Sequence, residues 1–213
     1  MTADRWTFGV EPLPRAREIA PLLRRVAGQI LAMERDDAAL AALAEDLRTA
    51  ERALAALVPR DPAPRVGDAA PDGRVYVDHA RDVGAFNPCF PEYSIRVDGD
   101  RAQGTVTFPI VFEGPPGVVH GGVLATFFDC VVQHHNCDVG VAGRTTSLLV
   151  EYRRPVPLGV DLGFTVERAA GAGRITSRAR LFDGDRVLCE ATVAAVAGDR
   201  ARLPPVSPRR PAP

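Results

Sequence analysis

One long apolar segment constrains the fold of this chain more than any other feature. It runs from His120 to about Cys137, is rich in Val, Leu and Phe, and contains no proline. An apolar run of this length is typical of a helix rather than a strand. A helix so apolar has to be covered on nearly every side. The remainder of the chain must therefore supply a surface that wraps around it.

The pattern of the surrounding residues predicts that this surface is a β-sheet. Six segments show strand periodicity and are separated by turn signals such as Asp98-Gly99 and Asp183-Gly184-Asp185. These segments span residues 93–97, 103–112, 145–153, 162–168, 174–182 and 186–196. Two precede the apolar helix and four follow it through short connections, so the strands should be mostly antiparallel. We expect an α+β fold with the helix enclosed by the concave face of the sheet.

The N-terminal part of the chain has a different periodicity. Apolar residues at helical spacing over residues 14–57 predict two amphipathic helices, with Asp36 or Asp37 capping the second and Pro59 ending it. We expect this pair to pack against the main domain or a partner subunit. The predicted division is a helical extension (1–60), a proline-rich linker and lead-in (61–92), the main domain (93–198) and a disordered tail (199–213).

Composition and charge exclude several classes of protein. The 26 basic and 27 acidic residues give a formal charge of −1, so nucleic acid is not an expected partner. No apolar run approaches the ~20 residues of a membrane span, so we expect no membrane partner. The cysteines form no C-x-x-C pair and the N-terminus lacks an apolar signal stretch, which favours the cytoplasm. No zinc-type spacing joins the cysteines and histidines, so no metal site is predicted.

The polar residues of the apolar helix lie along one line. At about 100° per residue, they project within about 40° of a common direction. They are Gly122, Thr126, Asp129, Gln133 and Asn136. Burying a carboxylate costs several kcal/mol unless it is stabilised, so Asp129 is either paired internally or faces a cleft. A polar contact across an oligomer interface, without catalysis, remains an open alternative.

The start of the same helix suits a substrate carbonyl. Pro115-Pro116-Gly117 leads into His120-Gly121-Gly122, and glycines let a ligand approach the backbone closely. The first helical amides are unpaired and would stabilise an oxygen that gains negative charge. Asp129 lies about 13 Å further along the helix, too far to act at the same centre. An antiparallel helix of a second subunit would bring its Asp129 opposite Gly121, so the sequence predicts an isologous homodimer.

Two stretches of the sequence resemble a known family. Residues 113–129, EGPPGVVHGGVLATFFD, are followed by the strand TTSLLVEYRRP at 145–155. Together they resemble the hotdog-fold acyl-CoA thioesterases of the phenylacetate-pathway (PaaI-like) and THEM types, over about residues 93–197. The resemblance implies a hotdog fold and hydrolysis of an acyl-CoA thioester in a homodimer or homotetramer. It implies no cofactor, since CoA is part of the substrate.

The resemblance also implies roles for individual residues. The amide of Gly121 would donate to the thioester oxygen, and Asp129 of the facing subunit would act as general base or nucleophile. His120 would orient the loop or a water, Gln133 would position water, and the Thr145 hydroxyl would assist the acid.

Four further residues are predicted to bind substrate. Gly122 and Thr126 lie on the polar line of the helix beside the predicted catalytic residues. Arg153 and Arg154 are candidates for the CoA tail, which lies near basic residues in relatives. A solvated strand end explains these two arginines equally well.

One position departs from the family pattern and keeps other functions open. Several relatives carry Asn or Gln six residues before the motif histidine, where this chain has Gly114, and the neighbouring Glu113 is not an amide donor. A hotdog protein that binds acyl-CoA or acyl groups without hydrolysis is therefore an alternative. An acyl-CoA hydratase or dehydratase is a weaker one, since only Asn87-Pro88 supports it.

Overall fold

The computed structural model describes residues 12–58, 81–140 and 143–197, and its centre is one six-stranded antiparallel sheet. The strand order is β1-β2-β4-β5-β6-β3, so β1 and β3 form the edges. The strands are β1 (Tyr93–Asp98), β2 (Arg101–Thr107), β3 (Gly143–Tyr152), β4 (Asp161–Gly171), β5 (Arg174–Asp183) and β6 (Arg186–Ala197). The helices are α1 (Pro14–Leu31), α2 (Ala38–Ala55), α3 (Val83–Phe86) and α4 (Gly121–Asp138), with a 3-10 turn η1 (Ile110–Phe112).

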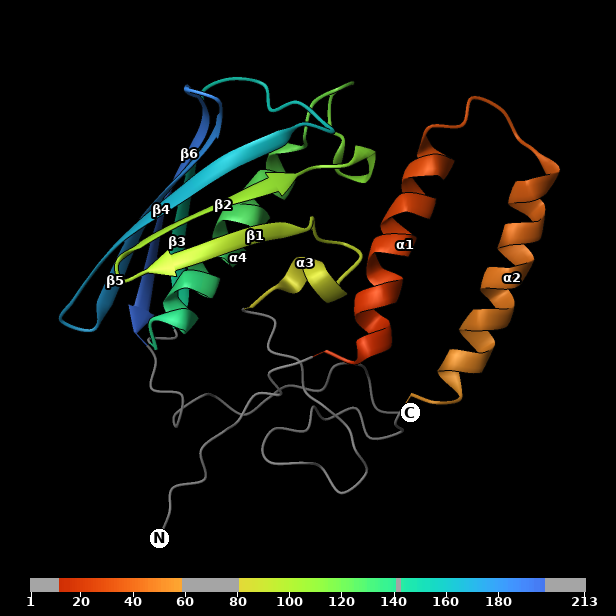
Figure 1. Cartoon of the computed structure of the whole chain (residues 1–213), viewed down its shortest axis with the longest axis horizontal. Coiled ribbons are helices and arrows are strands. Elements are labelled where there is room, and N and C mark those ends of the chain that lie inside the picture. The colour runs from red at the N-terminus through yellow and green to blue at the C-terminus, as the bar shows by residue number, and fades with distance from the viewer. Residues whose placement is uncertain (1–11, 59–80, 141–142, 198–213) are drawn as a thin grey trace, which may run out of the picture.

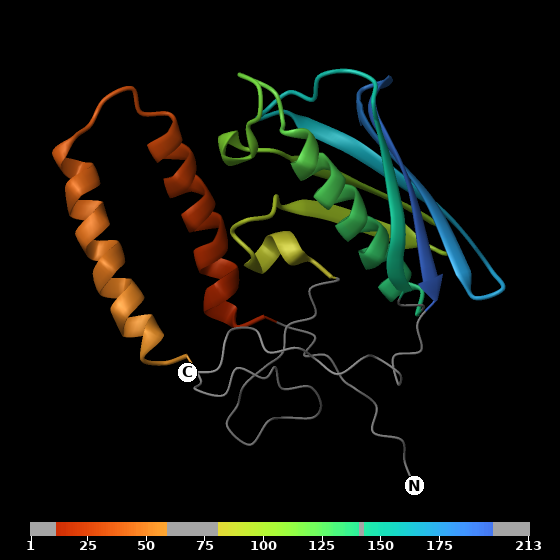
Figure 2. The same ribbon diagram turned by 180° about the vertical axis from the view of Figure 1, so that it is seen from behind.

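Helix α4 lies against the concave face of the sheet, as Figures 1 and 2 show from opposite sides. Phe127, Phe128 and Val131 on this helix have no exposed surface. The ring of Phe127 contacts those of Phe108 and Phe164 edge-on, with centroids 5.4 and 5.3 Å apart. The predicted arrangement, an antiparallel sheet wrapped around a long central helix, is confirmed.

Two boundaries in the lead-in and β2 differ from the prediction. The strand expected over residues 103–112 ends at Thr107, and Ile110–Phe112 forms η1 instead. Pro109 explains the end of the strand, because it has no amide hydrogen to donate to a neighbouring strand. The short helix α3 was not predicted, since four residues carry no readable helical period.

The N-terminal extension consists of the two predicted helices. The Asp37 side chain caps α2 by accepting a hydrogen bond of 2.9 Å from the amide of Ala39. Helix α1 packs against α3 and η1. Its Arg24 is only 5% exposed and donates to the carbonyl oxygens of Asn87 and Phe90 at 2.8 and 2.9 Å. This anchor joins the extension to the lead-in of the sheet, whereas α2 has no buried residue.

Some sequence-based predictions fall outside the described part of the chain. Most of the predicted linker and the predicted disordered tail, 199–213, lie there. The domain boundaries therefore stay a prediction. Within the described ranges, no helix combines the length and apolar character needed to cross a bilayer.

Candidate active site

His120 caps the N-terminus of α4. Its backbone is extended, with φ −63° and ψ 133°, and its ring Nδ1 accepts a hydrogen bond of 3.0 Å from the amide of Gly122. Side-chain acceptance of an early helical amide satisfies one of the groups that the helix itself leaves unpaired. Because Nδ1 is the acceptor, the geometry assigns the proton of the neutral ring to Nε2.

The loop before His120 is packed too tightly for a side chain at position 114. A Cβ atom built on Gly114 would lie 2.8 Å from the Cα of His120. The Gly114 amide donates to the carbonyl of Val118 at 2.8 Å, and a Glu113 carboxylate oxygen accepts from the Gly117 amide at 2.7 Å. Gly114 is therefore required by this loop, and the Glu113 carboxylate holds the loop together.

The predicted residues at the start of α4 lie together. Gly121 is the first residue of the helix, and its amide has no acceptor among the described residues. The Thr126 hydroxyl donates back to the carbonyl of Gly122 at 3.0 Å, and both residues are exposed. This end of the helix thus presents a free amide at the positive end of the helix dipole.

Asp129, Thr145 and Gln133 form a second group on the same helix face. The Thr145 hydroxyl donates to Oδ1 of Asp129 at 2.6 Å, and the Gln133 side-chain amide donates to the Thr145 oxygen at 2.8 Å. The amide of Gln133 thus directs the Thr145 proton toward the carboxylate. Oδ2 of the half-buried Asp129 takes no donor in the described part of the chain, so it is available to water.

A β-bulge in β3 brings Thr145 to this position. Thr145 pairs with Ala195 and Ser147 with Ala194, so Thr146 is an extra residue in the strand. Leu148, three residues after Thr145, packs against the core on the α4 side of the sheet. In a regular strand, residues at odd spacing face opposite sides of the sheet. The bulge lets both face α4, and no residue pattern in the sequence indicates it.

The two groups do not meet within one chain. Helix α4 is continuous from Gly121 to Asp138. The amide of Gly121 and the carboxylate of Asp129 are therefore about 12 Å apart along the axis, at about 1.5 Å per residue.

Asn136, the last residue of the predicted polar line, has a different role. Its side chain has no exposed surface, and its Oδ1 accepts from Nε of Arg168 at 3.1 Å. Arg168 also donates to Asp100 at 2.7 Å. The accessible part of the polar line therefore ends at Gln133. No local pattern predicts the contact with Arg168, because this residue lies on β4, far from Asn136 in the sequence.

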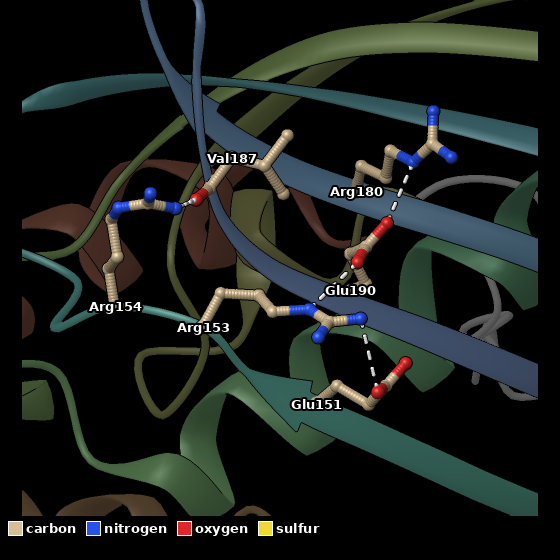
Figure 3. A network of polar contacts seen from close by, with 6 residues as sticks. All are labelled: Glu151, Arg153, Arg154, Arg180, Val187 and Glu190. Atoms are coloured by element: carbon tan, nitrogen blue, oxygen red, sulfur yellow. Dashed lines mark hydrogen bonds and ion pairs between the residues drawn. The ribbon is translucent and has the colours of Figure 1, made fainter.

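Arg153 and Arg154 hold the end of β3 (Figure 3). Nε of Arg153 donates to Glu190 at 3.0 Å, and its Nη2 lies 3.1 Å from Glu151. Hydrogen bonds from Arg153 and Arg180 keep the pKa of the Glu190 carboxyl below its usual value. Arg154 donates to the carbonyl of Val187 at 2.8 Å. Both arginines thus make structural contacts that limit their freedom to bind a ligand.

The histidines at the end of α4 pack inside the fold. His134 Nδ1 lies 2.8 Å from the hydroxyl of Tyr93, and Nε2 of His135 is 2.8 Å from the carbonyl oxygen of Gly99. Both side chains are buried. Across residues 12–58, 81–140 and 143–197, no three His, Cys, Asp or Glu side chains gather as a metal site would need.

Comparison with known proteins gives consistent results, although no protein-family model matches the chain. Acyl-coenzyme A thioesterase THEM4 of Xenopus laevis is 36% identical over 83 residues, 38% of this chain and 37% of that protein. A crystal structure of a thioesterase superfamily protein aligns with TM-score 0.72 and 28% identity, covering 92% of this chain and 98% of that one. A hypothetical thioesterase of Streptococcus pneumoniae, solved with coenzyme A, gives TM-score 0.47 at 20% identity, covering 50% and 88%.

The sheet topology and the alignment with the thioesterase superfamily structure of TM-score 0.72 assign the fold. The chain is an α+β protein with the hotdog fold of the thioesterase superfamily. More particularly, it resembles thioesterases of the THEM and PaaI type, as predicted from residues 113–155. The match spans little more than a third of the length of the THEM4 relative.

The packing at Gly114 predicts a specific sensitivity to a single methyl group. We expect Gly114→Ala to lower the free energy of unfolding by about 1–3 kcal/mol, because the new Cβ would lie 2.8 Å from the backbone Cα of His120, which cannot move without shifting the start of α4. Gly171→Ala is the matched control, since a Cβ there has no neighbour within 4 Å. Urea denaturation of both variants checks this. Equal losses at the two positions would contradict the proposed tight packing.

Burial makes the thiol of Cys130, next to the candidate acid, a poor nucleophile. Burial, and then the charge of Asp129, raises the pKa of Cys130 to about 12. A raised pKa leaves less thiolate at any given pH, so alkylation of Cys130 should rise about tenfold per pH unit from about pH 7 to 10. Site-resolved mass spectrometry measures this rate. Asp129→Asn should increase it by removing the negative charge, and a plateau near neutral pH would contradict the assignment.

Proposed function

We propose that this protein is an acyl-CoA thioesterase that hydrolyses its substrate to a free acid and CoA. The observation that carries the proposal is the chain of hydrogen bonds from Gln133 through Thr145 to Asp129. It orients a carboxylate and leaves one of its oxygens free to act on water. The similarity to proteins named as thioesterases supports the same reaction.

The chemistry follows from these groups. As a general base, Asp129 takes a proton from water while the water oxygen attacks the thioester carbonyl carbon. The carbonyl oxygen becomes an oxyanion, which the Gly121 amide stabilises. The carbon–sulfur bond then breaks, and the CoA thiolate takes up the proton held by Asp129. As a nucleophile, Asp129 would instead attack the carbonyl carbon and expel CoA as the thiolate, and water would then hydrolyse the resulting mixed anhydride to the free acid and the Asp129 carboxylate.

The site needs two subunits, because the acid and the amide are far apart on one helix. In the proposed homodimer the two α4 helices run antiparallel, so each Asp129 lies opposite the partner's Gly121. Two features support a shared interface. Gly122 and Thr126 on α4 are exposed in the single chain, and edge strand β3 exposes Leu149 by 63%. A homotetramer and a cytoplasmic location stay predictions.

The substrate would lie over the start of α4. Gly122 and Thr126 are exposed there and would line the path of the thioester. Arg153 and Arg154 remain candidates for the CoA tail through their exposed guanidinium edges, while their bonds to Glu190 and Val187 serve the fold.

A second function is binding of an acyl-CoA without hydrolysis. The observation that favours it is the loop at Gly114, which has no space for the amide side chain found in several relatives. The Glu113 carboxylate, bound to the Gly117 amide, does not replace that donor. Calorimetry with acyl-CoA, followed by recovery of the intact thioester, distinguishes this function from hydrolysis.

Asp129 is the first residue to test. We expect Asp129→Asn to lower kcat by about 10²–10³-fold, because it removes the general base or nucleophile. The measurement is release of free CoA from a panel of acyl-CoAs. Asp161→Asn is the matched control, since Asp161 also accepts a hydrogen bond from a threonine, Thr107, but lies outside the site. Undiminished hydrolysis by Asp129→Asn would remove the proposed acid from the mechanism.

Subunit complementation tests the shared site. Gly121→Pro removes the amide hydrogen. The backbone accepts proline at this first helical position because the preceding His120 is extended, and the added ring displaces the exposed Tyr152 side chain only at the site that the variant already inactivates. We expect this variant and Asp129→Asn each to be inactive alone. A mixture refolded together contains heterodimers that retain one complete site, so it should recover about a quarter of the wild-type rate. No recovery from mixed dimers would contradict a site built from both subunits.

A further inference from the structure

Tyr152 ends strand β3 beside the start of helix α4. Its hydroxyl donates to the carbonyl oxygen of Gly121 at 2.9 Å. Its ring stands where a side chain at position 121 would extend, since a Cβ there would lie 3.2 Å from both Cζ and Oη of Tyr152. The contact joins residues 31 positions apart, so only the pairing of the sheet with the helix creates it.

The peptide unit between Gly121 and Gly122 is held at both ends. Tyr152 binds its oxygen at 2.9 Å, and the His120 ring binds its amide hydrogen, with 3.0 Å between the two nitrogen atoms. Two successive glycines have the widest backbone freedom of any residue pair. Fixing this peptide plane restricts rotation about the backbone bonds of Gly121. The direction of the free Gly121 amide is restricted with it.

Tyr152 is itself held in place by its neighbours in the chain. The backbone amides of Arg153 and Arg154 both donate to the carbonyl of Leu188, at 3.0 and 2.9 Å. Their side chains bind Glu190 and Val187, as Figure 3 shows. The end of β3 is therefore tied to β6 directly after Tyr152.

The hydroxyl matters more than the ring for this contact. Tyr152 is 55% exposed, so the ring gains little from burial. Partial desolvation, and then the nearby Cys189, raises the pKa of the Tyr152 hydroxyl above its usual value. The main effect of Tyr152 is therefore its hydrogen bond to the first carbonyl of α4, which restricts the orientation of that peptide group.

We propose that Tyr152 is a positioning residue, which holds the start of α4 so that the Gly121 amide points at the substrate oxygen. This inference rests on the proposed thioesterase function. Tyr152 acts through Gly121 and does not need to touch the reacting atoms. A hydrogen-bond donor that is already oriented stabilises the oxyanion without having to move during the reaction. A small displacement of such a donor lowers the rate of the chemical step steeply.

Tyr152→Phe tests the hydroxyl while it keeps the ring. We expect kcat for acyl-CoA hydrolysis to fall about tenfold, with KM within about twofold of the wild-type value. The melting temperature should be unchanged. Thr105→Val is the matched control, because it removes an exposed hydroxyl that bonds Ser94 on the far strands of the sheet. An unchanged kcat would overturn the positioning role. If KM rose at the same time, the result would show instead that Tyr152 binds substrate.

A second measurement does not depend on activity. In nitrogen-15-labelled protein, hydrogen exchange of the Gly122 amide should be about tenfold faster in Tyr152→Phe than in wild type or Thr105→Val, because the peptide is released at one end. Unchanged exchange would overturn the positioning role whatever the activity. Faster exchange in a protein that cleaves no thioester would support the role of Tyr152 at the helix start and reject the proposed thioesterase function.

Discussion

Enclosure of α4 by the concave face of the sheet is the constraint on which the rest of the structure depends. The helix carries Phe127, Phe128 and Val131, which have no exposed surface, and only a sheet curved around it provides that cover. One stripe of the helix stays uncovered, and it bears Gly122, Thr126 and the half-buried Asp129. The same packing that stabilises the domain thus leaves these three residues in a line at the accessible side of the helix.

The two ends of that stripe have different chemistry. At the start of α4, His120, Tyr152 and the tight loop at Gly114 hold a free amide in one orientation. In the middle of the helix, Thr145 and Gln133 hold a carboxylate. Neither group is complete as a site for thioester hydrolysis, because an acid and an oxyanion donor have to act on one carbonyl. The proposed antiparallel dimer resolves this separation by joining the amide of one subunit to the acid of the other.

The N-terminal extension is attached by a contact of a different kind. Arg24 is nearly buried and binds two backbone oxygens of the lead-in, Asn87 and Phe90, so α1 is held by hydrogen bonds as well as by apolar packing. If α1 moved away, the buried guanidinium of Arg24 would lose these hydrogen bonds, and the folded state would lose stability. The two bonds therefore fix the position of α1 on the lead-in. Helix α2 has no comparable anchor.

The sequence alone determined the features that repeat along the chain. The apolar run at 120–137 identified the central helix, alternation identified the strands, and the glycines after His120 marked the helix start. These signals are local, because the spacing of apolar residues and the residues that begin or end a helix or strand lie within that element or next to it. Which distant side chains meet depends on how the strands and the helix pack against one another. The bulge at Thr146 turns Thr145 toward Asp129, Tyr152 reaches Gly121, and Arg168 binds Asn136 inside the fold. Such contacts depend on strand register and on the position of the helix over the sheet, which no local pattern of residues encodes.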